Sequence, residues 1–114
     1  MRLKTRIWVK AYLRRAMSEG IAGYIATSGD DFAGAIFIHI DDLDGAHYLF
    51  GPAPAGLAKS SDERHWISCF EDAPVTKEQA DNYLSQQRKY DPDLWIVELE
   101  DKQGRHFLGD FLVE

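Results

Sequence analysis

Four histidines and one cysteine are the residues of this sequence whose side chains most readily do chemistry. They are His39, His47, His65, His106 and Cys69. No two histidines have the i, i+4 spacing of a zinc-binding helix, and the chain contains no Cys-x-x-Cys pair. We therefore expect no bound metal and no cofactor.

Nucleophilic catalysis is not expected either. Cys69 lies in an apolar stretch, where a cysteine usually packs as a small hydrophobic residue. His65 is four residues away, roughly 13 Å along an extended strand, which is too far to activate the thiol. The serines lack a nucleophile elbow, and the glycines form no phosphate-binding loop. We therefore predict no catalytic residue.

Two pairs of acidic residues are the remaining candidates for acid–base chemistry. Asp91 and Asp93 bracket a proline before a predicted strand, and Glu98 and Glu100 share one face of that strand. Paired carboxylates act as acid and base where a pocket shifts their pKa values. An exposed acidic strand edge explains the same residues and is the commoner case.

The chain is expected to be organised around a β-hairpin over residues 33–54. β-branched and aromatic residues fill the first strand, and Asp44-Gly45 favours a two-residue type I′ turn. The aspartates near the turn are typical of side chains that accept hydrogen bonds from nearby backbone, and they match only fragments of a calcium loop. In this register His39 and His47 point to opposite faces, whereas a four-residue loop would shift the register by one and mix the faces.

The remaining elements follow from hydrophobic periodicity. Helices are predicted over residues 5–19 and 76–90, and further strands over residues 21–28, 64–70, 94–100 and 105–108. Short links and sharp turns favour antiparallel pairing. The predicted fold is α+β, a single antiparallel sheet built on the central hairpin with two covering helices, in the order α-β-β-β-β-α-β-β. We expect one domain over residues 1–114.

Charge is distributed unevenly along the chain. The 114 residues carry a net charge of −6, which argues against general binding of nucleic acid. Residues 1–15 nevertheless hold six basic residues and no acidic one. Arg6, Lys10 and Arg14 form a candidate basic face on the first helix. The alternative is a docked helix whose solvated side happens to be rich in Lys and Arg, and this is the commoner case.

Several blocks of the sequence resemble a known bacterial family. They are LKTRIWVKAYLRR, GAIFIHIDDLDG, YLFGPAP, DPDLWIVELED and GRHFL. Together they resemble the domain of unknown function numbered 1491, over nearly the whole chain. The resemblance implies a small, single-domain bacterial protein of the cytoplasm, and it implies no activity, cofactor or catalytic residue. A single cysteine and the lack of an apolar run of about 18 residues favour the same location, with no membrane span.

Two hypotheses about function follow. The first is a small interaction or regulatory module without catalytic activity, whose candidate interaction face consists of Phe37, His39, Tyr48, Phe50 and Trp66. The second is a small ligand-binding domain or enzyme, whose pocket would be formed by His39, Tyr48, His65, Trp66 and acids of the C-terminal strand.

The candidate interaction face predicts a protein partner or a homodimer. The second predicted helix is too narrowly apolar to cover these aromatic side chains, and large uncovered apolar patches usually mark an interface. The alternative is that the C-terminal residues 111–113 fold over the face and leave a monomer.

Overall fold

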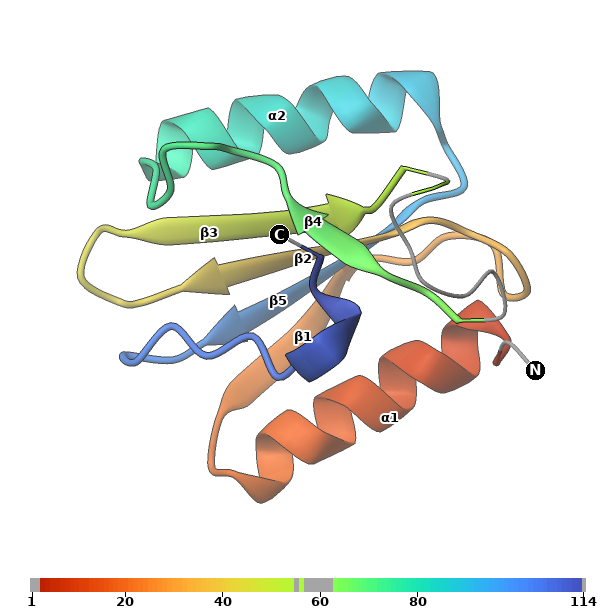
Figure 1. The fold of residues 1–114 in the computed structure, drawn as a ribbon, viewed down its shortest axis with the longest axis horizontal. Helices are drawn as coiled ribbons and strands as arrows, with labels where there is room; N and C mark the ends of the chain where they lie inside the picture. Colours follow the sequence, from red (N-terminus) through yellow and green to blue (C-terminus); the bar gives the residue numbers. More distant parts are fainter. Residues whose placement is uncertain (1–2, 55, 57–62, 114) are drawn as a thin grey trace.

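The computed structural model describes residues 3–54, 56 and 63–113, and it contains two helices and a five-stranded sheet (Figure 1). In chain order the elements are α1 (Thr5–Ser18), β1 (Ala22–Thr27), β2 (Ile36–Asp41), β3 (His47–Pro52), β4 (Trp66–Ser68), α2 (Lys77–Tyr90), β5 (Trp95–Glu100) and a 3-10 helix, η1 (Gly109–Phe111). The predicted α+β class is confirmed. Among the described residues, no helix is long and apolar enough to cross a membrane.

The strand order in the sheet is β1-β5-β2-β3-β4. β5 runs parallel to β2, with Ile38 beside Val97, and the other three pairs are antiparallel. The expectation of an entirely antiparallel sheet is therefore wrong at this one pair. The reason is α2, which carries the chain from β4 at one edge back to the middle of the sheet. Such a helical crossover returns the chain in the same direction as before.

The hairpin between β2 and β3 has a three-residue loop, so the predicted two-residue turn is wrong. Asp41 lies opposite His47, and Asp42 N–H donates to the Ala46 carbonyl oxygen at 3.1 Å. The Asp42 carboxylate accepts hydrogen bonds from two loop N–H groups at 2.8 and 2.9 Å. The left-handed φ of 91° at Gly45 closes the loop. This register places His39 and His47 on the same face of the sheet.

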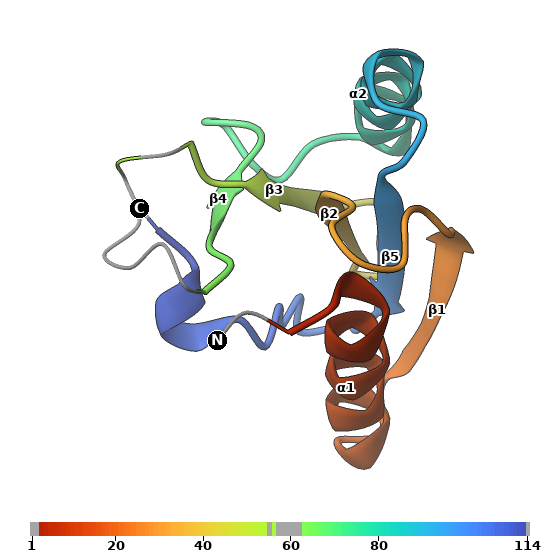
Figure 2. The ribbon, with the colours of Figure 1, turned by 90° about the vertical axis from the view of Figure 1, so that its right-hand side faces the viewer.

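Two apolar cores lie on the two sides of the sheet, under α1 and under α2 (Figure 2). The core on the α1 side includes Val9, Tyr12, Ile38, Trp66, Trp95 and Val97. The core on the α2 side includes Phe37, Leu49, Leu84, Leu94 and Ile96. Alternate residues of β2 and β5 enter opposite cores, so these two strands are buried on both faces.

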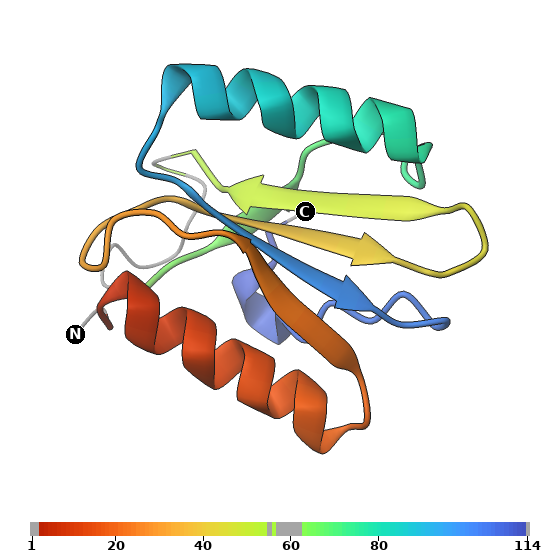
Figure 3. The ribbon, with the colours of Figure 1, turned by 180° about the vertical axis from the view of Figure 1, so that it is seen from behind.

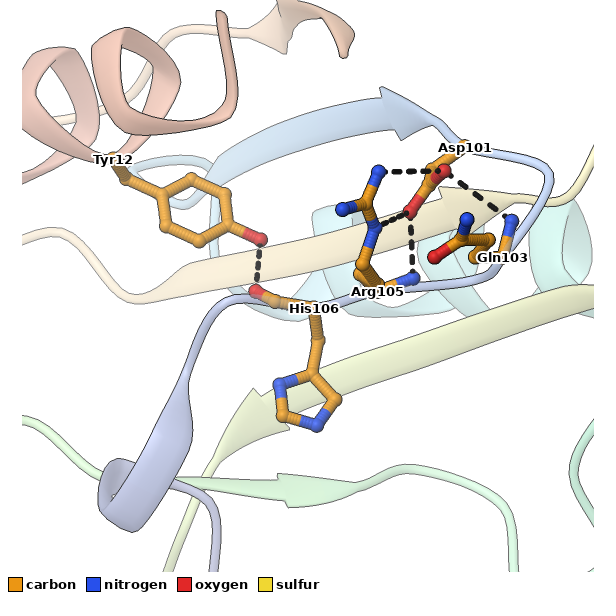
Figure 4. A network of polar contacts seen from close by, with 5 residues as sticks. All are labelled: Tyr12, Asp101, Gln103, Arg105 and His106. Atoms are coloured by element: carbon orange, nitrogen blue, oxygen red, sulfur yellow. Dashed lines mark hydrogen bonds and ion pairs between the residues drawn. The ribbon is translucent and has the colours of Figure 1, made fainter. Parts of the chain in front are cut away.

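The chain after β5 forms a loop and not the strand predicted over residues 105–108. The carboxylate of Asp101 accepts hydrogen bonds from the backbone and the side chain of Arg105 (Figure 4). The hydroxyl of Tyr12 donates to the carbonyl oxygen of His106 at 2.6 Å. Phe107 has a φ of 57°, which lies outside the region that a strand requires. Together these contacts turn the segment toward α1 and away from a ladder of strand hydrogen bonds.

The last described residues dock beside β4. The N–H of Val113 donates to the carbonyl oxygen of Trp66 at 2.7 Å, and Leu112 forms a parallel β-bridge with the same residue. Leu108 is also buried. The C-terminal residues therefore pack on the chain's own sheet. Such docking of residues 111–113 was the alternative to an uncovered aromatic face.

Trp66 is one of the two tryptophans that are almost completely buried in the α1-side core. It is 1% exposed, its ring lies 4.5 Å from that of Trp8, and its indole N–H donates to the Ile36 carbonyl oxygen at 3.0 Å. We expect Trp66→Ala to lower the free energy of unfolding by about 3–5 kcal/mol, as measured by urea denaturation. Tyr90→Ala, at a residue 82% exposed, is the control and should cost less than about 0.5 kcal/mol. Similar losses for the two variants would contradict this account of the core.

Candidate functional site

A network of polar side chains lies on the α2 side of the sheet, across four neighbouring strands. The histidine network, as we call it, consists of Tyr24 on β1, His39 on β2, His47 on β3 and Glu98 on β5. His39 Nε2 lies 2.9 Å from His47 Nδ1, and His39 Nδ1 lies 3.8 Å from Glu98 Oε2. The Tyr24 hydroxyl makes a side-chain hydrogen bond with Glu98. The network therefore links strands that are far apart in the sequence.

Both imidazole rings of the network are almost completely buried. His39 is 3% exposed and His47 is 4% exposed, whereas the side chain of Glu98 keeps 19% of its surface accessible. The hydrogen bond to Glu98, followed by burial, raises the pKa of Tyr24 to about 12. Tyr24 itself is 47% exposed, so it forms the solvent side of the network.

Burial lowers the pKa of His39, against the opposing effect of the Glu98 carboxylate. The nearby charge on a protonated His47 would lower it further, while Asp81 of α2 and Asp41 raise it. The hydrogen bond between the rings needs one donor nitrogen and one acceptor nitrogen, so full protonation of both rings would break it. In this contact one ring nitrogen donates and the other accepts.

The histidine network is also tied to the start of α2. His47 and Val75 exchange two backbone hydrogen bonds of 2.9 Å, directly before the N-cap residue Thr76. Thr76 and Gln79 form a capping box, in which the side chain of each accepts a hydrogen bond from the backbone N–H of the other. Lys77, in the first turn, pairs with Asp81 at 2.6 Å. A shift of the His47 backbone would therefore also shift Val75, which precedes the first turn of α2.

A metal site is not formed by these side chains as they are placed. Within residues 3–54, 56 and 63–113, no three His, Cys, Asp or Glu side chains are arranged to hold a metal ion. His39 and His47 use one ring nitrogen each on each other. The contact between the two rings links β2 to β3.

The candidate aromatic face is divided between the two sides of the sheet. Phe37 and His39 lie on the α2 side, while Tyr48, Phe50 and Trp66 belong to the α1 side. All of them are buried except Tyr48, which is half-buried. The premise of one uncovered aromatic face is thus wrong. The physical reasons are the one-residue change in hairpin register and the docking of the chain's own C-terminal residues.

The residues named for the alternative pocket are divided in the same way. His39 and Glu98 come together, but Tyr48 and Trp66 lie on the opposite side of the sheet. The His65 ring packs edge-on against Phe111 with ring centroids 5.9 Å apart. The structure therefore assembles only the contact between His39 and an acid of the last strand.

A separate groove of about 460 Å³ lies between α2 and the strands β3 and β4. Cys69 and Tyr83 lie in its lining, with Phe37 and Pro52. Burial raises the pKa of the Cys69 thiol to about 11, although its hydrogen bond with Tyr83 opposes that change. The thiol is thus protonated at neutral pH, which agrees with the expectation that Cys69 behaves as a small apolar residue.

The candidate basic face of α1 lies on the exposed side of the helix. Arg6 is half-buried and pairs with Asp31 at 2.9 Å. Lys10 and Arg14 are exposed, and in the part of the chain that the structure describes neither has an ion-pair partner. These three residues follow one another at intervals of four, so they form one row along the helix. We call them the basic row.

Comparison with protein families gives a match over nearly the whole chain. Residues 3–109 match the family model described as "Protein of unknown function (DUF1491)". The chain belongs to the DUF1491 family. No curated protein matches it.

Solved structures of similar proteins support the DUF1491 fold. The crystal structure of a DUF1491 family protein from Caulobacter crescentus CB15 is 34% identical, with a TM-score of 0.82 and 100% of each chain covered. An NMR structure of a DUF1491 family protein from the same organism is 36% identical, with a TM-score of 0.82 over 100% of this chain and 99% of that one. The solution structure of protein Atu0922 from A. tumefaciens is 36% identical, with a TM-score of 0.75 over 88% of this chain and 86% of that one.

Sequence reasoning missed two features of this DUF1491 chain. Tyr24 was not a candidate residue, because an isolated tyrosine in a short strand gives no signal of its partner. The pairing of His39 with His47 was missed because the predicted register separated them. Two aspartates directly before the turn, Asp41 and Asp42, were the available signal, since such side chains favour a longer capped loop.

The DUF1491 chain should lose stability as the pH falls below about 6.5, the ordinary pKa of histidine. The pKa of His39 is lowered in the folded state, so below 6.5 the unfolded chain binds more protons and stability decreases. Burial lowers the pKa of His106 as well, which acts in the same direction. We expect His39→Gln to reduce the slope of unfolding free energy against pH between about pH 6.5 and 5. Urea denaturation at several pH values measures that slope.

Leu84→Ala is the control for this experiment. It removes a buried side chain of the same core but no titrating group, so it should lower stability equally at every pH. A slope in His39→Gln that equals the wild-type slope would show that His39 does not couple folding to protonation.

Proposed function

We propose that this protein is a small, non-catalytic interaction module of the bacterial cytoplasm, which binds an acidic segment of a partner protein on the exposed side of α1. The observation that carries the proposal is the pair Lys10 and Arg14. They are exposed cations of one helical row, and they have no ion-pair partner among the described residues. Unpaired cations in a strongly acidic chain attract a partner of opposite charge.

Apolar side chains next to the basic row support a protein partner. Ile7 is 51% exposed and Met17 is 69% exposed, both on α1. Specific interfaces combine an apolar centre with a polar rim, and methionine and arginine are enriched in them. Burial of these two side chains would supply affinity, while the cations would supply orientation and a faster encounter.

The overall charge supports a protein over a nucleic acid. The net charge of −6 means that most of the surface would repel a phosphate backbone. An acidic protein segment is short enough to contact α1 alone. The proposed module therefore has no general affinity for nucleic acid.

The other partners and functions expected from the sequence have less support. A homodimer or a protein partner was predicted to bind the candidate interaction face. Its residues lie on both sides of the sheet, and all are buried except the half-buried Tyr48; they are Phe37, His39, Tyr48, Phe50 and Trp66. A ligand pocket or active site around His39 would have to open before a ligand could reach either imidazole, since both rings are almost fully buried.

A photo-crosslinking amino acid at Ala11 tests the proposal in the native cell. Ala11 is exposed between Ile7 and Arg14, and Gln86, exposed on α2, is the matched control position. We expect adducts with other proteins, identified by mass spectrometry, from Ala11 and not from Gln86. The double variant Lys10→Glu, Arg14→Glu should reduce these adducts at least about fivefold, because both cations become repulsive to the acidic partner.

A second double variant separates the site from the total charge. Arg88→Glu, Lys89→Glu makes the same change of charge on α2, and it should leave the adducts unchanged. Adducts of equal yield from Ala11 and Gln86 would contradict the proposal. Adducts only with lipid, or only with further copies of the chain, would replace it with membrane-surface binding or with a homodimer.

A further inference from the structure

β1 is the outermost strand on one side of the sheet, next to α1. It pairs with β5 on its inner side, and its outer hydrogen-bonding groups have no strand partner among the described residues. Figure 3 shows β1 at the outside of the sheet with α1 beside it. A register irregularity after Ile25 limits the regular part of this edge to Ala22–Ile25.

The open edge of β1 lacks most of the protection that natural sheets give to such strands. Its sequence, AGYIAT, has no charged residue and no proline, which are the usual means of preventing a further strand from pairing. Tyr24 is 47% exposed in the middle of the regular stretch. The backbone of this edge is therefore available to an extended segment of another chain.

The basic row of α1 lies on the same side of the helix as β1. A Cβ atom added to Gly23 of β1 would lie 2.9 Å from Leu13 Cδ2, so Leu13 marks the part of α1 that contacts this strand. Lys10 and Met17 are three residues before and four after Leu13, which places them on the same side of the helix. Arg14 lies one helical turn after Lys10, next to Lys10 and Met17 on the helix surface. An added strand would thus run past exposed cations on the α1 side.

The opposite face of the same edge has the opposite charge. Tyr24 and Glu98 lie on the α2 side of the sheet, opposite each other in the register of β1 and β5. Ala22 is similarly opposite Glu100. A strand added to β1 would therefore meet positive charge on one face and negative charge on the other, and its side chains alternate between those faces.

We propose that β1 accepts an extended segment of the partner protein as a sixth strand, with acidic side chains on the α1 side and neutral or basic side chains on the other. This inference rests on the proposed binding of an acidic partner at α1, and it specifies how that partner is held. Backbone hydrogen bonds to Ala22–Ile25 supply affinity, and the alternating charge supplies specificity.

A second copy of this chain fits the open edge less well. In an antiparallel β1–β1 pair about a two-fold axis perpendicular to the sheet, both α1 helices lie on the same side. That arrangement brings the basic row of one copy toward the basic row of the other, and Glu98 toward its own equivalent. Like charges facing each other oppose the pairing. An alternating acidic segment of another protein has no such conflict.

An eight-residue peptide in which glutamate and threonine alternate is the probe. With ¹⁵N-labelled protein, we expect millimolar peptide to shift the amide signals of Lys10, Arg14 and Ala22–Ile25. It should slow hydrogen exchange of the outward-facing β1 amides by at least about tenfold, because they become hydrogen-bonded. A peptide of the same composition with four glutamates followed by four threonines should bind more weakly, since it cannot place all its charges on one face.

Charge reversal provides the matched control. The double variant Lys10→Glu, Arg14→Glu should no longer bind the glutamate–threonine peptide. It should instead bind a peptide in which lysine and threonine alternate in the same pattern. Arg88→Glu, Lys89→Glu on α2 should bind as the wild type does.

The outcomes separate the two proposals. Amide shifts at α1 without slower exchange in β1 would overturn strand addition and leave docking on α1 in place. No change at either element, together with absent crosslinks from Ala11, would overturn both. Slow exchange in β1 without peptide, increasing with protein concentration, would show that a second copy occupies the edge and would overturn this inference.

Discussion

The hydrogen bonds of Asp41 and Asp42 to the loop between β2 and β3 set the register on which both faces of the sheet depend. Asp41 accepts the N–H of Leu43 at 2.8 Å, and Asp42 accepts two further N–H groups of the loop. With a three-residue loop inside the Asp42–Ala46 hydrogen bond, the side chains of β3 occupy faces opposite to those of a two-residue turn. His39 and His47 then come together at 2.9 Å. The histidine network exists because of this loop.

The insertion of β5 between β1 and β2 is the second constraint. It places Val97 and Ile96 at the centre of the two cores, and it brings Glu98 beside His39. It also moves β1 to the outside of the sheet. The same topology therefore builds a buried polar network and leaves an open strand edge.

Two groups of side chains of opposite charge lie on opposite sides of the sheet. The basic row lies on α1, on one side, while Asp41, Glu98 and Glu100 lie on the other side. Within the described residues the contact between them is limited, and Lys10 and Arg14 have no acidic partner. At the β1 edge these two groups of side chains lie on either side of one strand, and this arrangement is the basis of the strand addition proposed above.

Features that depend on a few neighbouring residues could be predicted from the sequence. The sequence shows the capping-box spacing of Thr76 and Gln79, the two helices, the strands rich in β-branched residues and the basic residues along the first helix, because helix caps and periodicity act over about four residues. The family resemblance was visible for the same reason, as blocks of sequence.

Only the tertiary structure decided the hairpin register, the position of β5 and the partners of the histidines. Both faces of the hairpin are largely buried and carry apolar side chains, so the hydrophobic pattern does not distinguish two registers that differ by one residue. The place of β5 depends on pairing with strands more than fifty residues away along the chain, such as Ile38 with Val97. Local periodicity does not indicate which distant strand pairs with which. The strand order is determined by the need to bury both apolar cores at the same time.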